Sequence, residues 1–273
     1  MKLFNKKDNY SKMKSNVVIP SDISDNDKGL KEIISISDTF QSEYISKYPE
    51  LIFNQSKSPI CVNCSIALIR HIQLYKRYGI DVIPDVLYNY CKRDNNMYQG
   101  NAVVPKDALE SLKKYGIPEV NENIDKYLSN LGKGYKLSEV EKLYENKLVN
   151  ILDRDKIYGY YRLSTINEIK TAILNFSAVT AMFRDHYSLY IPNIVAGIRA
   201  YINFSKYQYD NTKLGQHQMT IIGWRNNHWI VQNSWGKNYG LNGIVHIPME
   251  YPITEAWAIV DKLDDNNFGI YSK

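Results

Sequence analysis

The residues of this sequence whose types and spacing could do covalent chemistry are two cysteines, a histidine and an asparagine. Cys61 and Cys64 form a CxxC motif ahead of an apolar run, and His217 and Asn233 stand in two alternating runs much further along the chain. A thiolate is a strong nucleophile, an imidazole transfers protons near neutral pH, and a carboxamide can fix the orientation of an imidazole. The set predicts nucleophilic catalysis by a cysteine, provided that folding brings these side chains together.

A β-hairpin is predicted for the stretch 215–243, where it would hold the histidine and the residue that orients it. Side chains of an extended chain repeat every two residues. On that period one strand presents His217, Met219 and Ile221 on one face, and the other presents Trp229, Val231 and Asn233. The polar turn at residues 225–227 favours a tight antiparallel reversal. The carboxamide of Asn233 is therefore expected near the imidazole of His217.

A buried helix is predicted to begin at or just after Cys64. The residues that follow are apolar on nearly every side, the run then becomes amphipathic, and Gly79 stands where a C-terminal cap belongs. Open amide groups and the positive end of the helix dipole favour a thiolate and lower a pKa that starts near about 8.5. Cys64 is therefore the predicted nucleophile. Cys61 is expected to be a small buried residue, or a disulfide partner in an oxidising compartment.

The elements around these residues change along the chain from mostly helical to mostly β. Helices are expected at Pro105–Gly116, after the capping box of Ser138 with Glu141, and after that of Thr165 with Glu168. Strands are expected at residues 157–163, 178–183, 199–204 and 243–248, in addition to the hairpin. The pattern predicts an α+β chain with a polar N-terminal arm (1–40), a helical lobe (41–150) and a β-rich lobe (151–273), and a cleft between the lobes.

Composition limits the classes to which the protein can belong. The 273 residues are 44% hydrophobic, and the net charge of +5 is scattered along the chain, which favours a globular monomer that does not bind nucleic acid. No apolar run is long enough to span a membrane, and the first residues lack the apolar core of a secretory signal, so a cytoplasmic location is expected. Three cysteines are too few for a disulfide scaffold and fit a reducing compartment.

The candidate residues resemble those of the papain-like cysteine peptidases. In the family order of glutamine, cysteine, histidine and asparagine, the sequence offers Gln55, Cys64, His217 and Asn233. The most specific part is WIVQNSWGKNYGLNG, where the family's WGxxWGxxG appears as Trp235-Gly236-Lys-Asn-Tyr239-Gly240-Leu-Asn-Gly243. The similarity extends over most of residues 45–260. It implies a two-lobed fold with the nucleophile helix in one lobe and an antiparallel, barrel-like sheet in the other.

The resemblance implies a role for each of these residues in hydrolysing a polypeptide, without a metal or cofactor. Cys64 is the nucleophile, held as a thiolate by His217, which later protonates the leaving amine and activates the water that hydrolyses the thioester. Asn233 accepts the second imidazole N–H, and Trp235 covers that bond from water. Gln55 and the backbone N–H of Cys64 are expected to donate to the tetrahedral oxyanion.

Three features depart from the family pattern around the cysteines. The loop from Gln55 to Cys64 looks about three residues longer than in the family, so Gln55 is not certain to reach the oxyanion. Ser65 stands where many members have tryptophan, and Val62 and Asn63 replace the small residues that let substrate backbone pass. These departures concern efficiency and the shape of the subsites, and they leave the cysteine and histidine pair in place.

Other interpretations of the same residues remain open. The CxxC could be redox-active, and a zinc site could be made from Cys61, Cys64, Cys91 and His71. His228, close to the hairpin turn, is a second candidate for the base. The chain could be a catalytically degenerate family member with a binding or structural role, for example in a virus particle. It could also be a transpeptidase that passes the acyl group to an amine, and the N-terminal arm could lie in or near the cleft.

Overall fold

The structure is a computed structural model that describes residues 20–22, 24, 26–55, 59–86, 88, 103–119, 152–204 and 215–262. The α-helices in these ranges are α2 (Cys61–Tyr78), α4 (Pro105–Tyr115) and α7 (Ile166–Phe176). Short 3-10 helices are η1 (Leu30–Glu32), η3 (Asp153–Asp155) and η4 (Tyr187–Tyr190). The strands are β1 (Glu43–Ile45), β2 (Gly159–Arg162), β3 (Val179–Arg184), β4 (Asn193–Val195), β5 (Arg199–Tyr201), β6 (Gln216–Arg225), β7 (His228–Gln232), β8 (Ile244–Pro248) and β9 (Ile253–Val260).

These strands join one open sheet in which most neighbours run antiparallel. The order along the sheet is β2-β9-β3-β6-β7-β8-β5-β4, β1 is added to β6, and β5 pairs with β8 in parallel. The α+β class predicted from the sequence is therefore confirmed. The sheet in the described part of the chain stays open, whereas the resemblance implied a barrel-like arrangement.

Most of the predicted elements are present with slightly different ends. The helix expected after Thr165 is α7, and its capping box is formed, with Glu168 N–H donating to Thr165 Oγ1 at 3.1 Å. The helix expected after Ser138 lies outside the described residues. Strands β1, β4 and β9 were not predicted. No helix among the described residues has both the length and the apolar character needed to cross a bilayer.

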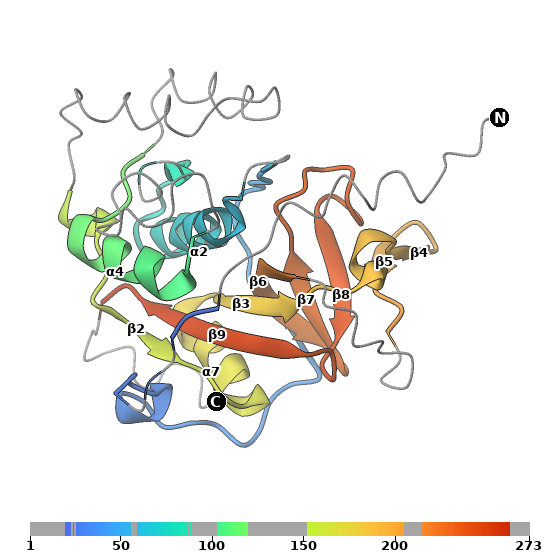
Figure 1. Cartoon of the computed structure of the whole chain (residues 1–273), viewed down its shortest axis with the longest axis horizontal. Helices are drawn as coiled ribbons and strands as arrows, with labels where there is room; N and C mark the ends of the chain where they lie inside the picture. The colour runs from blue at the N-terminus through green and yellow to red at the C-terminus, as the bar shows by residue number, and fades with distance from the viewer. Residues whose placement is uncertain are drawn as a thin grey trace.

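Helices cover both faces of the sheet and create two hydrophobic cores (Figure 1). Helices α2 and α4 pack on one face, and α7 packs on the other. Adjacent residues of β6 point to opposite faces of the sheet and pack in different cores. Ile222 belongs to the core that contains α2, and Ile221 belongs to the core that contains α7. Strand β6 is therefore packed directly against the helix that carries the cysteines.

Helix α2 begins at Cys61, one turn earlier than predicted. Ile60 is the N-cap residue and makes no side-chain cap, and the N–H of Cys64 donates to the carbonyl oxygen of Ile60 at 2.9 Å. The helix ends at Gly79, whose φ of 66° is the left-handed conformation expected of a glycine cap. Because of this early start, Cys61 and not Cys64 occupies the helix end whose amide groups lack intrahelical partners.

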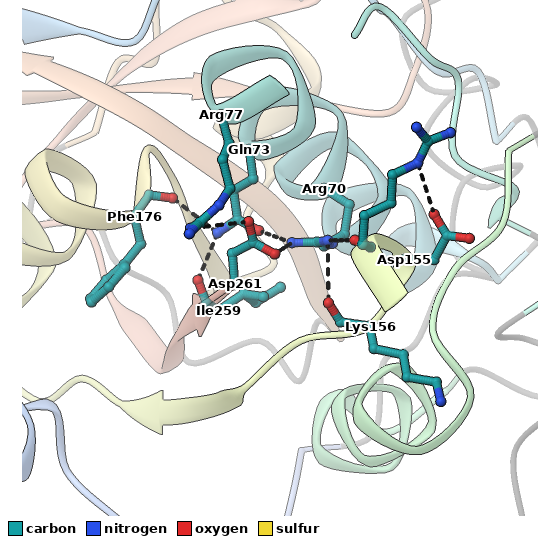
Figure 2. A network of polar contacts seen from close by, with 9 residues as sticks. Arg70, Gln73, Arg77, Asp155, Lys156, Phe176, Ile259 and Asp261 are labelled. Atoms are coloured by element: carbon teal, nitrogen blue, oxygen red, sulfur yellow. Dashed lines mark hydrogen bonds and ion pairs between the residues drawn. The ribbon is translucent and has the colours of Figure 1, made fainter. Parts of the chain in front are cut away.

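A buried arginine ties the middle of α2 to the end of the sheet (Figure 2). Arg70 donates from Nη1 to Gln73 Oε1 at 2.6 Å and to Asp261 Oδ1 at 2.8 Å, and from Nη2 to the carbonyl oxygen of Arg154 at 2.6 Å. Gln73 in turn donates to the carbonyl oxygen of Ile259 at 2.7 Å. Since Arg70 has no exposed surface, the network fixes the position of the helix against β9.

Part of the predicted N-terminal arm is packed into the fold. The N–H of Ser21 donates to Glu255 on β9 at 3.0 Å and its hydroxyl donates to the same carboxylate at 2.5 Å. Leu30 is fully buried in the core that contains α7. Residues 1–19 lie outside the described residues, so an arm in or near the cleft stays a prediction.

Candidate active site

Strands β6 and β7 form the predicted hairpin and bring His217 and Asn233 together. The two strands are joined by a two-residue turn, Asn226-Asn227. Nε2 of His217 lies 2.7 Å from Oδ1 of Asn233. That oxygen also accepts the backbone N–H of Ser234 at 2.7 Å, which identifies it as the carbonyl oxygen of the carboxamide. The imidazole therefore donates from Nε2 and keeps a lone pair on Nδ1.

The lone pair on Nδ1 of His217 is available to a proton. Nδ1 is buried and has no hydrogen-bond partner among the described residues. Trp235 stacks on the imidazole with ring centroids 4.5 Å apart, and Tyr190 stacks on the indole at 5.1 Å. The stack holds the ring in one plane and covers one side of it, which leaves Nδ1 as the atom that can act as a base.

The loop that carries Gln55 is hydrogen-bonded to Ser234, the residue that follows Asn233. The N–H of Gln55 donates to the carbonyl oxygen of Ser234 at 2.8 Å, and the hydroxyl of Ser234 donates to Oε1 of Gln55. With its oxygen held in this way, the Gln55 carboxamide has its NH2 group left to donate elsewhere. The side chain of Gln55 is hydrogen-bonded to the sulfur of Cys61.

Cys61 is the first residue of α2, and hydrogen-bond donors surround its sulfur. Besides Gln55, the backbone amides of Gln218, Val62 and Cys61 itself interact with it. Gln218 directly follows His217 on β6, so this contact sets the sulfur next to the residue that carries the base. A helix N-terminus with several donors is the environment in which a thiol becomes reactive.

Cys64, the nucleophile predicted from the sequence, lies one turn further inside the helix. Its N–H donates to the carbonyl oxygen of Ile60 and is therefore not open to an oxyanion. Its sulfur is hydrogen-bonded to the side chain of Ser234. Burial and the nearby Cys61 raise the pKa of the Cys64 thiol. These surroundings favour a neutral, packed thiol.

Burial favours the neutral forms of both Cys61 and His217 at pH 7. Removal from water raises the pKa of Cys61 to about 11, against the hydrogen bonds that lower it. Burial also lowers the pKa of His217 to about 4, although the bond to Asn233 favours the charged ring. Burial thus acts in the direction of a thiol and an imidazole, opposite to the thiolate and imidazolium that the resemblance implies.

The other histidines that were considered are engaged elsewhere. Both ring nitrogens of His71 contact backbone carbonyl oxygens, that of Val82 at 2.6 Å and that of Pro49 at 3.0 Å. His228 packs edge-on against the ring of Tyr201 at 5.3 Å. In the part of the chain that the structure describes, no three His, Cys, Asp or Glu side chains form a group that could hold a metal ion. Cys91, a member of the possible zinc set, lies outside the described residues.

Two residues that shape this site were not singled out from the sequence. Ser234 bonds to both Gln55 and Asn233, and Gln218 contributes a backbone amide near the sulfur of Cys61. One signal was present in the sequence. The apparent excess of three residues after Gln55 disappears when the loop is measured to Cys61 instead of Cys64.

Sequence comparison relates the chain to cysteine proteases. The family model described as papain family cysteine protease matches residues 88–256, a range that contains His217 and Asn233 but neither Cys61 nor Cys64. Cathepsin B-like cysteine proteinase 3 of Caenorhabditis elegans is 32% identical over 104 residues, which are 34% of this chain and 25% of that protein. The chain therefore matches a quarter of the length of this curated relative.

Solved structures of cysteine proteases have a similar fold. Xylellain, a cysteine protease from Xylella fastidiosa, superimposes with a TM-score of 0.64 at 16% identity, over 91% of this chain and 96% of xylellain. The cysteine protease and lectin-like domains of Cwp84 from Clostridium difficile superimpose with a TM-score of 0.66 at 16% identity, over 95% of this chain and 59% of that chain. At these identities the likeness is one of fold.

Proposed function

The chain belongs to the papain family of cysteine proteases, and from that premise we propose that it hydrolyses polypeptides through a thioester formed on a cysteine of α2. The observation that carries the proposal is the pair of His217 and Asn233, whose 2.7 Å contact presents Nδ1 as a base beside the N-terminus of that helix. The reaction needs no metal or cofactor.

Cys61 is the proposed nucleophile, in preference to the Cys64 predicted from the sequence. The sulfur of Cys61 is hydrogen-bonded to the backbone amide of Gln218, the residue next to His217. The sulfur of Cys64 is hydrogen-bonded to the side chain of Ser234 instead. Cys61 also lies at the helix end with open amides, while the amide of Cys64 is already used within the helix. The Ser234 contact also favours a thiolate, but the sulfur of Cys61 has several donors beside the open amides and that of Cys64 has one, so negative charge is favoured more at Cys61.

The proposed reaction begins when the sulfur of Cys61 attacks the peptide carbonyl and its proton passes to Nδ1 of His217. Gln55 and the amide of Cys61 donate to the oxyanion, and such donors act most strongly in a buried site. His217 then gives the proton to the leaving amine. The same imidazole removes a proton from water, which attacks the thioester and releases the acid. Asn233 holds the ring throughout.

Access to the site requires movement of its surroundings. Cys61 is 1% exposed and His217 is 2% exposed, so a peptide cannot reach the sulfur without displacing neighbouring groups. We expect iodoacetamide, a small reagent, to modify Cys61 faster than a peptidyl epoxide of equal intrinsic reactivity does. Equal rates would show that the site is already open in solution.

The proposal is tested by hydrolysis of an unstructured polypeptide and by epoxide labelling of the wild type and three variants. Cys61→Ser and His217→Ala are expected to lower kcat by about 10³-fold or more, because they remove the nucleophile and the base. Cys64→Ser is expected to stay within about threefold of wild type. Trypsin cleavage after Lys57 and Arg70 isolates both cysteines in one peptide, 58–70, in which fragmentation locates the label.

Each alternative has its own outcome in this experiment. Loss of activity and label in Cys64→Ser, with both kept in Cys61→Ser, would restore Cys64 as the nucleophile and leave the hydrolytic function intact. No hydrolysis and no selective labelling in the wild type would indicate a degenerate protein with a binding or structural role. Products that incorporate an added amine would indicate a transpeptidase.

A further inference from the structure

The CxxC motif is not explained by the proposed reaction, which uses one of its two cysteines. Cys61 and Cys64 are the first and fourth residues of α2, so they stand one above the other on one face of its first turn. Both are free thiols in this structure, and they are 1% and 2% exposed. The charge of an ionised Cys61 raises the pKa of Cys64, which places the two sulfurs in one electrostatic environment.

The spacing of the pair is compatible with a disulfide. Residues three apart on a helix have Cβ atoms about 5–6 Å apart, and disulfides join Cβ atoms about 3.5–4.5 Å apart. A small adjustment of the first turn would close the difference. This turn has no side-chain N-cap, because Ile60 provides no acceptor, so its ends are held less firmly than in a capped helix.

We propose that Cys61 and Cys64 form a reversible disulfide that switches the peptidase off under oxidation. This inference rests on the proposed function, in which Cys61 is the nucleophile, and it gives Cys64 the role of a resolving cysteine. The switch needs an oxidant, and a hydroperoxide such as hydrogen peroxide has the required chemistry.

The chemistry takes two balanced steps. The Cys61 thiol gives its proton to Nδ1 of His217 as its sulfur attacks one oxygen of hydrogen peroxide, which gives Cys61 sulfenic acid and hydroxide, and His217 then protonates the hydroxide to water. The Cys64 sulfur then attacks the Cys61 sulfur and displaces the hydroxyl as a second water, with loss of the thiol proton of Cys64. Overall the two thiols lose two protons and two electrons, and hydrogen peroxide is reduced to two molecules of water. A dithiol such as dithiothreitol returns the protons and electrons by thiol–disulfide exchange.

The surroundings of the two sulfurs give them different roles in these two reaction steps. Burial raises the pKa of both thiols, but the helix amides and the Gln218 amide act against burial at Cys61 alone, so Cys61 is the sulfur that reacts first. Cys64 lies deeper, bonded to Ser234, where an isolated thiol would be inert. The disulfide removes the nucleophile beside His217, and it protects Cys61 from further oxidation to the irreversible sulfinic acid.

The test oxidises the full chain with hydrogen peroxide and follows peptide 58–70 by mass spectrometry, together with hydrolysis. In the wild type we expect this peptide to lose two hydrogen atoms, activity to fall by about tenfold or more, and dithiothreitol to restore it to within about twofold. In Cys64→Ser we expect Cys61 to gain two or more oxygen atoms, and activity to stay lost after dithiothreitol. Cys91→Ser is the matched control, and it should behave as the wild type.

Several results would overturn the switch. They are oxygen gain on Cys61 of the wild type without the cross-link, a cross-link that joins Cys91, or equal recovery by dithiothreitol in the wild type and Cys64→Ser. The wild-type mass measurement needs no variant, so it decides the question even if a substitution impairs folding. A cross-link in a protein that hydrolyses no peptide before oxidation would overturn the proposed function and leave the disulfide established.

Discussion

Ser234 connects the two halves of the candidate site. Its hydroxyl donates to Oε1 of Gln55, its carbonyl oxygen accepts the N–H of Gln55 at 2.8 Å, and its own N–H donates to Oδ1 of Asn233 at 2.7 Å. One residue thus orients both the amide proposed for the oxyanion and the group that holds the imidazole of His217. Ser234 acts through these neighbours, as a positioning residue.

Ser234→Ala is expected to lower kcat by about tenfold and to leave KM within about twofold, because the carboxamide of Gln55 loses the hydroxyl that holds its oxygen while the rest of the site is unchanged. Gln55→Ala, which removes the donor itself, should cost about 10² to 10³ in kcat. Steady-state kinetics of the two single variants and the double variant measure the coupling. If Ser234→Ala has the same effect in the Gln55→Ala background as in the wild type, Ser234 does not act through Gln55.

The sequence could predict the contact of His217 with Asn233, because strand periodicity and a tight turn leave little freedom in how a hairpin pairs. It could not predict the start of α2. The residue at the N-cap is Ile60, which carries none of the polar groups that mark a helix start, and the apolar run is most evident after Cys64. The sequence prediction therefore named Cys64, whereas the contacts at the start of α2 support the proposal of Cys61.

Helix α2 is held at its N-terminus and in its middle by different interactions. At its N-terminus the sulfur of Cys61 contacts β6, and in its middle Arg70 bonds to Asp261 and to the carbonyl oxygen of Arg154 (Figure 2). A thiol attack on a peptide depends on the distance of the sulfur from the base to well within 1 Å. The Arg70 network therefore contributes to the site without touching it.

Arg70→Leu is expected to lower the free energy of unfolding by about 3 to 5 kcal/mol, because the buried carboxylate of Asp261 loses its main partner. The matched control is Arg77→Leu. Arg77 lies 3.7 Å from the same carboxylate with a side chain that is 24% exposed, so its loss should cost about 1 kcal/mol or less. Urea unfolding measures both, and equal losses would mean that the position of α2 does not depend on Arg70.

Strand β9 shows why some elements could not be predicted. It lies between β2 and β3 in the sheet, yet its sequence carries Glu255 among apolar residues. The carboxylate is buried and bonded to Ser21 and to Nε1 of Trp257, partners that only the folded chain brings near. Strands β1 and β4 have three residues each, too few for a period of two to be recognised.

At the scale of the whole molecule, the lowered pKa values of two buried histidines, His217 and His246, affect how stability depends on pH. Burial lowers the pKa of His217 and of His246 from 6.5 to about 4. The unfolded chain therefore binds more protons than the folded chain between these values. Their stabilising contribution is fully present above pH 6.5 and is lost as the pH falls toward 4.

The free energy of unfolding is expected to fall by about 2 kcal/mol from His217 alone between pH 7 and pH 5. Urea unfolding at the two pH values measures the change. His217→Gln removes this titration, so its free energy of unfolding should depend less steeply on pH in the same interval. An identical slope in the variant would show that His217 is not buried as a neutral ring in solution.

The α+β class of the whole molecule was predictable because helical periodicity dominates the first half of the chain and alternation the second. The arrangement of the open sheet was not. The pairing of β1 with β6 and the insertion of β9 between β2 and β3 join segments far apart in sequence, and neither leaves a local signal. The packing of Leu30 into the core was hidden in the same way, because its neighbours in the sequence are polar.

Because Trp235 stacks on His217, its fluorescence is expected to report whether the imidazole of His217 is protonated. An imidazolium 4.5 Å from an indole withdraws excited-state electron density from it, whereas a neutral imidazole does so far less. The emission of Trp235 should therefore dim as His217 gains its proton. With phenylalanine in place of Trp224, Trp229 and Trp257, a fluorescence titration would read the protonation of one ring inside the intact protein.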